Sequence, residues 1–278
     1  MVDYYALITL DFLRRDSMHR LLACFFVLAC SLPSQAGIQT KIVEYRDGNV
    51  VLEGLLAWDD AIAKAPGVLI VHQWMGRTDY EEARAKQLAK QGFVAFALDI
   101  YGKGVRPNTT QEAGKLAGVY KNDRSLYRRR LQAGLEQLQG QGMVDRQKIA
   151  AIGYCFGGTG VLELARSGAE INGVVSFHGG LDSLHPEEAK KIKAKVLICH
   201  GADDPFVPTK DIEAMKKEFA DADVDWQMIY YSEAVHSFTQ PMAGNDNSRG
   251  AAYQERADKR SWQAMNNFFG EIFQPAAK

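Results

Sequence analysis

The sequence predicts an α/β fold in which a mostly parallel sheet is covered by helices on both faces. Short apolar runs rich in β-branched residues alternate with longer segments of helical periodicity. Several of these runs are apolar at every position, as expected for strands buried on both faces. A chain of 278 residues, 46% of them hydrophobic, suits one large domain of this class.

The elements follow one another in a regular order. A hairpin opens the body, with strands at residues 42–45 and 50–58 on either side of a turn signal, Arg46-Asp47-Gly48. Further strands are predicted at residues 67–71, 93–98, 149–153, 173–177, 195–199 and 225–230. Helices are predicted at residues 80–90, 111–119, 124–140, directly after residue 155, at 209–219 and at 249–273. Strands separated by helices in this way favour a parallel sheet.

Residues 1–36 are predicted to be a signal peptide region that precedes a domain at 37–278. Met18-His19-Arg20 is a basic start, the ten residues 21–30 are apolar, and Ser34-Gln35-Ala36 is a small-x-small cleavage site. Ten apolar residues are too few to span a bilayer, so we expect a secreted, periplasmic protein without stable membrane insertion. The acidic residues within 1–17 fit an n-region poorly, so translation is expected to begin at Met18. Lipoprotein processing at Cys30 is the alternative.

The charge and the cysteines exclude several classes of protein. A net charge of -1 lacks the basic surplus of a nucleic-acid-binding protein. Signal cleavage leaves Cys155 and Cys199, too few for a disulfide framework. Cys199, in a strand-like run, is expected to be a buried inert thiol, with a Cys155–Cys199 bridge as the alternative. No His/Cys/Asp cluster has the spacing of metal ligands, so neither a metal nor an organic cofactor is implied.

The strongest functional motif is Gly153-Tyr154-Cys155-Phe156-Gly157, directly after the apolar run 149–152. It predicts a strand that turns sharply into a helix, with a nucleophile at the apex of the turn. Such an elbow holds the reactive atom clear of the sheet, and the flanking glycines remove side chains that would clash. Because the apex residue is a cysteine, the predicted nucleophile is a thiol.

A nucleophile at an elbow needs a base, and the base needs an orienting acid, in the chain order nucleophile, acid, histidine. Asp204 follows the strand at 195–199, and His236 follows the strand at 225–230. Both therefore fall in loops at the same sheet edge as Cys155. Competing side chains lie nearby: the carboxylate of Asp203, which spacing barely separates from Asp204, and the imidazoles of His178 and His200. His236 is preferred because it follows the last strand.

Three ordered motifs resemble the dienelactone hydrolase (carboxymethylenebutenolidase-like) family over most of the chain after about residue 40. They are Gly153-Tyr154-Cys155-Phe156-Gly157-Gly158, Asp204-Pro205-Phe206-Val207-Pro208 and His236-Ser237-Phe238. The resemblance implies an α/β-hydrolase fold with a mostly parallel eight-stranded sheet, and hydrolysis of small esters or lactones. It implies Cys155 as nucleophile, His236 as general base and acid, and Asp204 as orienting carboxylate. The backbone N–H groups of Phe156 and Trp74 would form the oxyanion hole.

Departures from the family pattern bear on the substrate. Gln73 replaces a glutamate that helps to ionise the thiol, so His236 is expected to generate the thiolate, aided by the helix N-terminus. The two arginines that hold the substrate carboxylate in the family correspond to Lys103 and Gln240, and Arg106 is near enough to substitute for the first. These four side chains are the expected substrate contacts, and the lost charge favours a neutral or singly charged ester or lactone.

Two other functions stay open at this point. One is a thiol acyltransferase or a peptidase on the same scaffold. The other is a non-enzymatic binding or redox-sensing protein that uses Cys155 as an exposed thiol, since a low-pKa thiol outside the cytoplasm is prone to oxidation. The sequence carries no signal for the oligomeric state.

Overall fold

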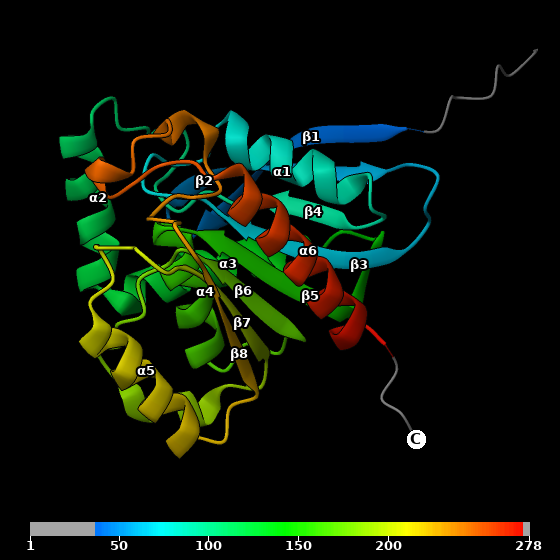
Figure 1. Cartoon of the computed structure of the whole chain (residues 1–278). Helices are drawn as coiled ribbons and strands as arrows, with labels where there is room; N and C mark the ends of the chain where they lie inside the picture. The colour runs from blue at the N-terminus through cyan, green and yellow to red at the C-terminus, as the bar shows by residue number, and fades with distance from the viewer. Residues whose placement is uncertain (1–36, 275–278) are drawn as a thin grey trace, which may run out of the picture. The chain divides into compact units, whose positions relative to one another are not determined.

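The computed structural model describes residues 37–274, which form an eight-stranded sheet with helices on both faces (Figure 1). The strand order is β1-β2-β4-β3-β5-β6-β7-β8. The strands β1 and β2 are antiparallel to each other and β2 is antiparallel to β4, whereas the strands from β4 to β8 run parallel. The predicted fold class is therefore confirmed. The predicted signal peptide and its cleavage site lie outside the described residues.

The elements have the following bounds. The strands are β1 (Ile38–Asp47), β2 (Val50–Asp59), β3 (Ala65–Val71), β4 (Val94–Ala97), β5 (Val144–Tyr154), β6 (Gly173–Phe177), β7 (Lys195–Gly201) and β8 (Trp226–Tyr231). The helices are α1 (Asp79–Ala89), α2 (Thr110–Asn122), α3 (Arg124–Gln139), α4 (Phe156–Arg166), α5 (Thr209–Asp221) and α6 (Glu255–Ile272), with 3₁₀ turns η1 (Pro186–Lys191), η2 (Pro241–Ala243) and η3 (Asn247–Arg249). Over residues 37–274, no helix has the length and apolarity that crossing a membrane requires.

The sheet separates two apolar cores. Helices α1 and α6 cover one face and α2 to α5 cover the other, as Figure 1 shows for α1 and α6 in front of the strands. Successive residues of β3 divide between the two cores, because side chains of a strand alternate between its faces. Leu69 points to the core of α3 and α4, while Ile70 points to the core of α1 and α6, and both are fully buried.

The elbow lies where β3, β5 and α4 approach one another most closely. Cys155 links β5 to α4 with a positive φ of 53°, a strained conformation for a residue with a side chain. A Cβ on Gly153 would lie 2.0 Å from Gly157 O, and a Cβ on Gly157 would lie 2.2 Å from Val71 O. Only glycine therefore allows these backbones to pack as they do, and the packing lifts Cys155 above the carboxyl edge of the sheet.

The closing helix was expected to span residues 249–273, and its start was wrong. α6 begins at Glu255, because the residues before it pair with the histidine loop. The N–H of His236 donates to Gly250 O (3.1 Å) and the N–H of Ala252 donates to His236 O (3.0 Å). Gly250 has a left-handed φ of 77°, which ends any helical path at that point. The segment thus holds the histidine instead of extending the helix.

Gly153→Ala is expected to lower the free energy of unfolding by about 3 kcal/mol or more, because its methyl group would overlap the backbone of α4. Gly270→Ala is the matched control: no heavy atom lies within 4 Å of a Cβ there, and it sits inside α6. The control is expected to gain about 0.5–1 kcal/mol from helix propensity. Urea unfolding of both variants measures this, and equal stability of the two would contradict the steric account.

Candidate active site

Cys155 stands at the carboxyl end of β5 and at the N-terminus of α4, and it is partly exposed. Its backbone N–H donates to Phe177 O (3.0 Å) and also faces His178 Nδ1 at 3.1 Å. These contacts fix the elbow to the end of β6. The other thiol among the described residues, Cys199, is free and fully buried, so the alternative of a disulfide between the two is not present.

The structure brings the three predicted triad side chains into one hydrogen-bonded chain. His236 Nε2 lies 3.1 Å from Cys155 Sγ, and His236 Nδ1 lies 2.8 Å from Asp204 Oδ2. The second oxygen of Asp204 accepts the N–H of Phe206 (2.9 Å), which holds the carboxylate in place. This is the order nucleophile, base, orienting acid that nucleophilic catalysis requires.

The competing side chains lie elsewhere. Asp203 is exposed, whereas Asp204 is buried beside the imidazole of His236. His178 is buried between the Cys155 N–H and the hydroxyl of Thr239, at 2.8 Å from its Nε2. His200 is buried at the end of β7 and packs edge-on against the ring of Tyr230. Neither of these histidines contacts the thiol sulfur.

Electrostatics favour an ion pair between the sulfur and the imidazole. Burial alone would lower the pKa of His236, but the Cys155 charge and the Asp204 hydrogen bond outweigh it and raise that pKa to about 10. Burial likewise opposes ionisation of Cys155, yet His236, the N–H of Phe156 and the cation of Lys121 lower the pKa of the thiol. The lowered pKa of the thiol and the raised pKa of the imidazole both favour a thiolate–imidazolium pair over the neutral pair.

The two expected oxyanion donors border the same cavity as the thiol. Phe156 is the first residue of α4, and its N–H faces the sulfur of Cys155. Trp74 lies in the loop after β3, and within residues 37–274 its N–H has no hydrogen-bond acceptor. Both N–H groups are thus available to a negative charge that develops beside Cys155.

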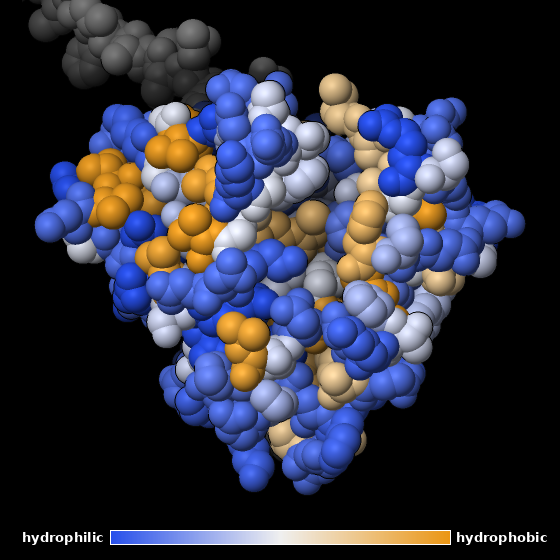
Figure 2. Space-filling model, turned by 90° about the vertical axis from the view of Figure 1, so that its left-hand side faces the viewer, coloured by the Kyte–Doolittle hydropathy of each residue, from blue (hydrophilic) through white to orange (hydrophobic). Residues whose placement is uncertain are grey.

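The cavity has a volume of about 590 Å³ and opens at the carboxyl edge of the sheet. Figure 2 faces this edge and shows a hollow near its middle with apolar and polar residues around it. Cys155 and His236 line it together with two cations, Lys121 and Arg249, and no carboxylate of residues 37–274 lines it. The other lining residues are Trp74, Thr110, Gly114, Ala117, Gly118, Phe156, Thr159, Gly180, Phe206, Val207, Ser237 and Ala251.

None of the four expected substrate contacts lines this cavity. Lys103 is exposed and forms an ion pair with Glu44 of β1. The guanidinium of Arg106 faces Asp99 (3.4 Å) and donates to Val105 O (2.7 Å). The side chain of Gln73 is buried, and that of Gln240 is partly buried in the turn before η2.

Sequence reasoning missed both cations that do line the cavity. For Lys121 a signal exists: Gly114, Ala117, Gly118 and Lys121 lie at i, i+3, i+4 and i+7, one face of a helix, and all four border the cavity. Small residues on that face leave room for a ligand beside the lysine. For Arg249 no signal exists, because the segment around it was expected to be helical.

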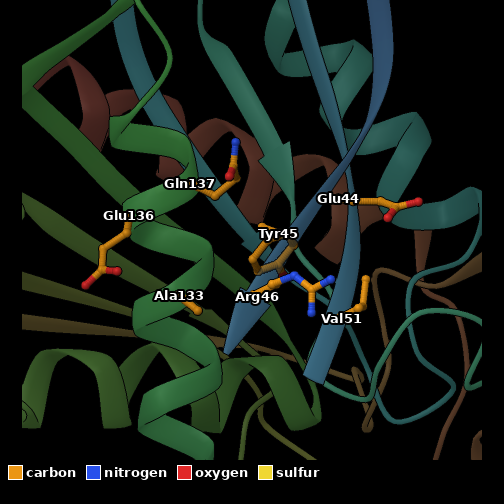
Figure 3. A pocket seen from close by; sticks show the side chains of 7 residues that line it. All are labelled: Glu44, Tyr45, Arg46, Val51, Ala133, Glu136 and Gln137. Atoms are coloured by element: carbon orange, nitrogen blue, oxygen red, sulfur yellow. The ribbon is translucent and has the colours of Figure 1, made fainter. Parts of the chain in front are cut away.

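A second hollow, of about 470 Å³, lies between the β1–β2 hairpin and α3 (Figure 3). Glu44, Tyr45, Arg46 and Val51 line it from the hairpin, and Ala133, Glu136 and Gln137 line it from α3. It contains neither a cysteine nor a histidine, so it offers no nucleophile–base pair. Within the described part of the chain, no group of three or more His, Cys, Asp or Glu side chains is arranged to hold a metal ion.

Cys155 is expected to react with iodoacetamide at pH 7 about tenfold faster than an unperturbed cysteine, because the His236 cation lowers the pKa of its thiol. His236→Gln should remove the cation and shift the rate profile toward alkaline pH. Mass spectrometry of the labelled protein from pH 5 to pH 9 measures this. Cys199 is the internal control: burial raises the pKa of its thiol to about 12, so it stays unlabelled in the folded protein. Identical profiles for wild type and His236→Gln would refute the ion pair.

Comparison with known proteins agrees with the geometry of the site. The family model described as "Dienelactone hydrolase family" matches residues 52–273. A solved dienelactone hydrolase-like promiscuous phosphotriesterase from metagenomic libraries is 41% identical, with 86% of this chain and 100% of that chain covered and a TM-score of 0.81. The solved structure m3DLH is 39% identical, with the same coverage and a TM-score of 0.83.

A curated protein is also similar to this chain in sequence. A protein of Aquifex aeolicus (strain VF5), named as a candidate carboxymethylenebutenolidase, is 27% identical over 238 residues, covering 82% of this chain and 97% of the relative. The family expected from the three motifs is thus confirmed, and its α/β-hydrolase fold agrees with the observed sheet. The chain belongs to the dienelactone hydrolase family and is a hydrolase of that ester- and lactone-cleaving group.

Proposed function

We propose that this hydrolase cleaves small carboxylic esters or lactones through a covalent thioester, with Cys155, His236 and Asp204 as the triad. The observation that carries the proposal is the continuous chain from Asp204 Oδ2 through His236 to Cys155 Sγ, at 2.8 Å and 3.1 Å. It ends at a cavity that Trp74 and Phe156 also line, and the N–H of Phe156 faces the sulfur. A nucleophile, a base and an oxyanion site in one place match acyl transfer.

In the first half-reaction the Cys155 thiolate attacks the ester carbonyl carbon and a C–S bond forms. The carbonyl oxygen becomes an oxyanion, which the N–H groups of Trp74 and Phe156 would hold. The His236 imidazolium then gives its Nε2 proton to the leaving alkoxide as the C–O bond breaks. Asp204 keeps the ring oriented and stabilises its positive charge.

In the second half-reaction a water molecule attacks the thioester carbonyl. His236, now neutral, takes one proton from this water, and the same two N–H groups hold the new oxyanion. The C–S bond breaks, the acid is released, and the proton returns the imidazole to its charged form beside the thiolate. Gln73 cannot take over the base role, because an amide does not accept a proton at neutral pH.

The charge of the cavity favours a substrate with one anionic group. Lys121 and Arg249 line the cavity, no carboxylate does, and neither cation forms an ion pair within residues 37–274. The exposed ring of Phe206, edge-on to His236 at 5.5 Å, adds an apolar contact at the same opening. A small aromatic or alkyl ester that carries a carboxylate fits both features.

Cys155→Ala is expected to abolish turnover of short-chain aryl esters and lactones, since within residues 37–274 no other thiol or hydroxyl contacts His236 Nε2. Cys199→Ala is the matched control and should keep full turnover, because Cys199 is buried away from the cavity. Initial rates over a panel of esters, lactones and one phosphotriester measure this. Substantial ester turnover by Cys155→Ala would end the triad assignment.

The same panel separates the other functions. Transfer of the acyl group to an added alcohol or amine, in preference to water, would identify an acyltransferase. Stoichiometric alkylation of Cys155 without turnover of any substrate would favour a binding or redox role. Turnover of the phosphotriester would extend to this chain the activity named for its 41% identical structural neighbour. Export to the periplasm stays a prediction of the sequence.

Lys121→Gln and Arg249→Gln are each expected to raise KM about two- to fivefold for a carboxylate-bearing ester, as removal of an exposed ion pair does. KM for the neutral ester of the same size should not change. Lys103→Gln is the control, because Lys103 pairs with Glu44 outside the cavity. Steady-state kinetics at low salt measures the difference. A rise of KM in Lys103→Gln alone would contradict this assignment and would place the anion site at Lys103, which corresponds to the family's first arginine.

A further inference from the structure

The loop after β3 is held by buried side chains in an unusual way. Gln73 and Trp74 have four backbone polar groups between them, and three of these meet a buried side chain. Gln73 N–H donates to Glu81 Oε1 (3.4 Å), Gln73 O lies 2.6 Å from His72 Nδ1, and Trp74 O accepts the hydroxyl of Tyr101 (2.9 Å). The fourth group, the Trp74 N–H, has no acceptor among residues 37–274. It is the N–H that borders the cavity.

The contacts of His72 determine which of its nitrogens carries the proton. The N–H of Ile100 donates to His72 Nε2 (3.1 Å), so this nitrogen is the acceptor of a neutral ring. The proton therefore sits on Nδ1 and is donated to Gln73 O. Burial is complete and lowers the pKa of His72 to about 4, against the opposing charge of Asp99, so the ring stays neutral at physiological pH.

Because the peptide bond is planar, the contact of His72 with Gln73 O also fixes the direction of the Trp74 N–H. In a trans peptide the C=O of Gln73 and the N–H of Trp74 point in opposite directions. With the carbonyl drawn toward His72 on the buried side, the N–H must point away from it, toward the cavity that Trp74 lines with Cys155. The N–H of Gly76 also donates to Gln73 O (3.1 Å) and closes the turn.

The other oxyanion donor needs no such support. The N–H of Phe156 belongs to the peptide whose carbonyl, Cys155 O, accepts from Gly158 N–H (2.9 Å) and Thr159 N–H (3.2 Å). These are the first backbone bonds of α4, so the helix itself orients that donor. Trp74 lies in an irregular loop, where only side chains and one turn bond can do the same.

We propose that His72 is a positioning residue, which as the neutral Nδ1–H tautomer holds the Gln73–Trp74 peptide with the Trp74 N–H aimed at the oxyanion. The inference rests on the proposed function, since it needs an oxyanion at Cys155. Tyr101 supports the same loop through Trp74 O. Because the oxyanion exists only in the transition state and the intermediate, the effect of His72 falls on kcat and not on KM.

Aromatic packing fixes the two donors relative to each other. The His72 ring stacks on Phe156 at 5.9 Å and meets the edge of Tyr101 at 4.8 Å. Tyr127 stacks on the other donor residue, Phe156, at 4.6 Å, and its hydroxyl donates to Phe156 O (2.8 Å). The residue that orients one donor thus packs directly on the residue that carries the other.

Two substitutions separate the two nitrogens of His72. In His72→Asn the side-chain N–H₂ replaces Nδ1 and can still donate to Gln73 O. In His72→Gln the amide oxygen replaces Nε2 and can still accept from Ile100 N–H, but the donor to Gln73 is lost. We expect His72→Asn to keep kcat within about fivefold, and His72→Gln to lose at least about tenfold, short of the roughly 10²–10³-fold loss of a whole oxyanion donor. KM should be unchanged in both.

A second readout does not depend on turnover. A trifluoromethyl ketone accepts the Cys155 thiolate at its carbonyl carbon, a C–S bond forms, and the former carbonyl oxygen becomes an oxyanion in the same hole. Its affinity should fall in His72→Gln in step with kcat and stay near that of wild type in His72→Asn. Tyr101→Phe, which removes one hydroxyl, tests the loop if the His72 variants fold poorly, and is expected to lower kcat several-fold at unchanged KM.

Tyr45→Phe is the control for stability alone. It removes a buried hydroxyl that bonds backbone atoms of Asp99, outside the Gln73–Trp74 loop, so it should lower the melting temperature and keep kcat. Two outcomes overturn the inference while Cys155-dependent turnover stands. One is an equal loss of kcat in His72→Asn and His72→Gln. The other is full kcat and full inhibitor affinity in His72→Gln or in Tyr101→Phe. Wild type without Cys155-dependent ester turnover overturns the proposed function, and the inference with it.

Discussion

The close approach of β3, β5 and α4 is the constraint on which the rest of the site depends. Gly153 and Gly157 let three backbones meet with no side chain between them. That contact raises Cys155 into a strained turn, and places the end of β3 directly beside the start of α4. Thus Cys155 and the two residues proposed as oxyanion donors, Trp74 and Phe156, come from two segments far apart in sequence but adjacent in the sheet. The thiol and the two proposed oxyanion donors are placed by this junction, whereas Asp204 and His236 reach the thiol from loops after β7 and β8.

Around this junction the protein keeps some groups charged and others neutral by different means. His236 is charged because two anionic partners outweigh the cost of its burial. His178, at 5.4 Å from the ring of His236, is neutral because burial lowers its pKa and the nearby His236 charge lowers it further. His72 is neutral because burial lowers its pKa. Three histidines at one sheet edge therefore differ in charge, which their neighbours set and not their residue type.

The sequence alone predicted those parts of the fold and of the site that local residue patterns encode. Apolar runs and glycine-flanked turns identify the strands and the elbow, and the loops after β7 and β8 contain Asp204 and His236 as expected. The start of α6 could not be predicted from the sequence. It depends on a backbone hydrogen bond between Ala252 and His236, which are distant in the chain, and local periodicity does not encode such a bond. The cations Lys121 and Arg249 were missed because cavity lining depends on how α2 and the loop before α6 pack.

The bridge between His236 and residues 250–252 links the base to the end of the chain. The backbone of His236 is bonded on both sides to the segment that leads into α6, and α6 is itself tied to α1 through the ion pair of Arg84 with Asp258. The backbone of His236 is thus held by the segment that leads into the C-terminal helix, whereas Cys155 is held by the centre of the sheet. We therefore expect local melting of α6 to disorder the loop of His236, so that heat inactivation precedes loss of the sheet.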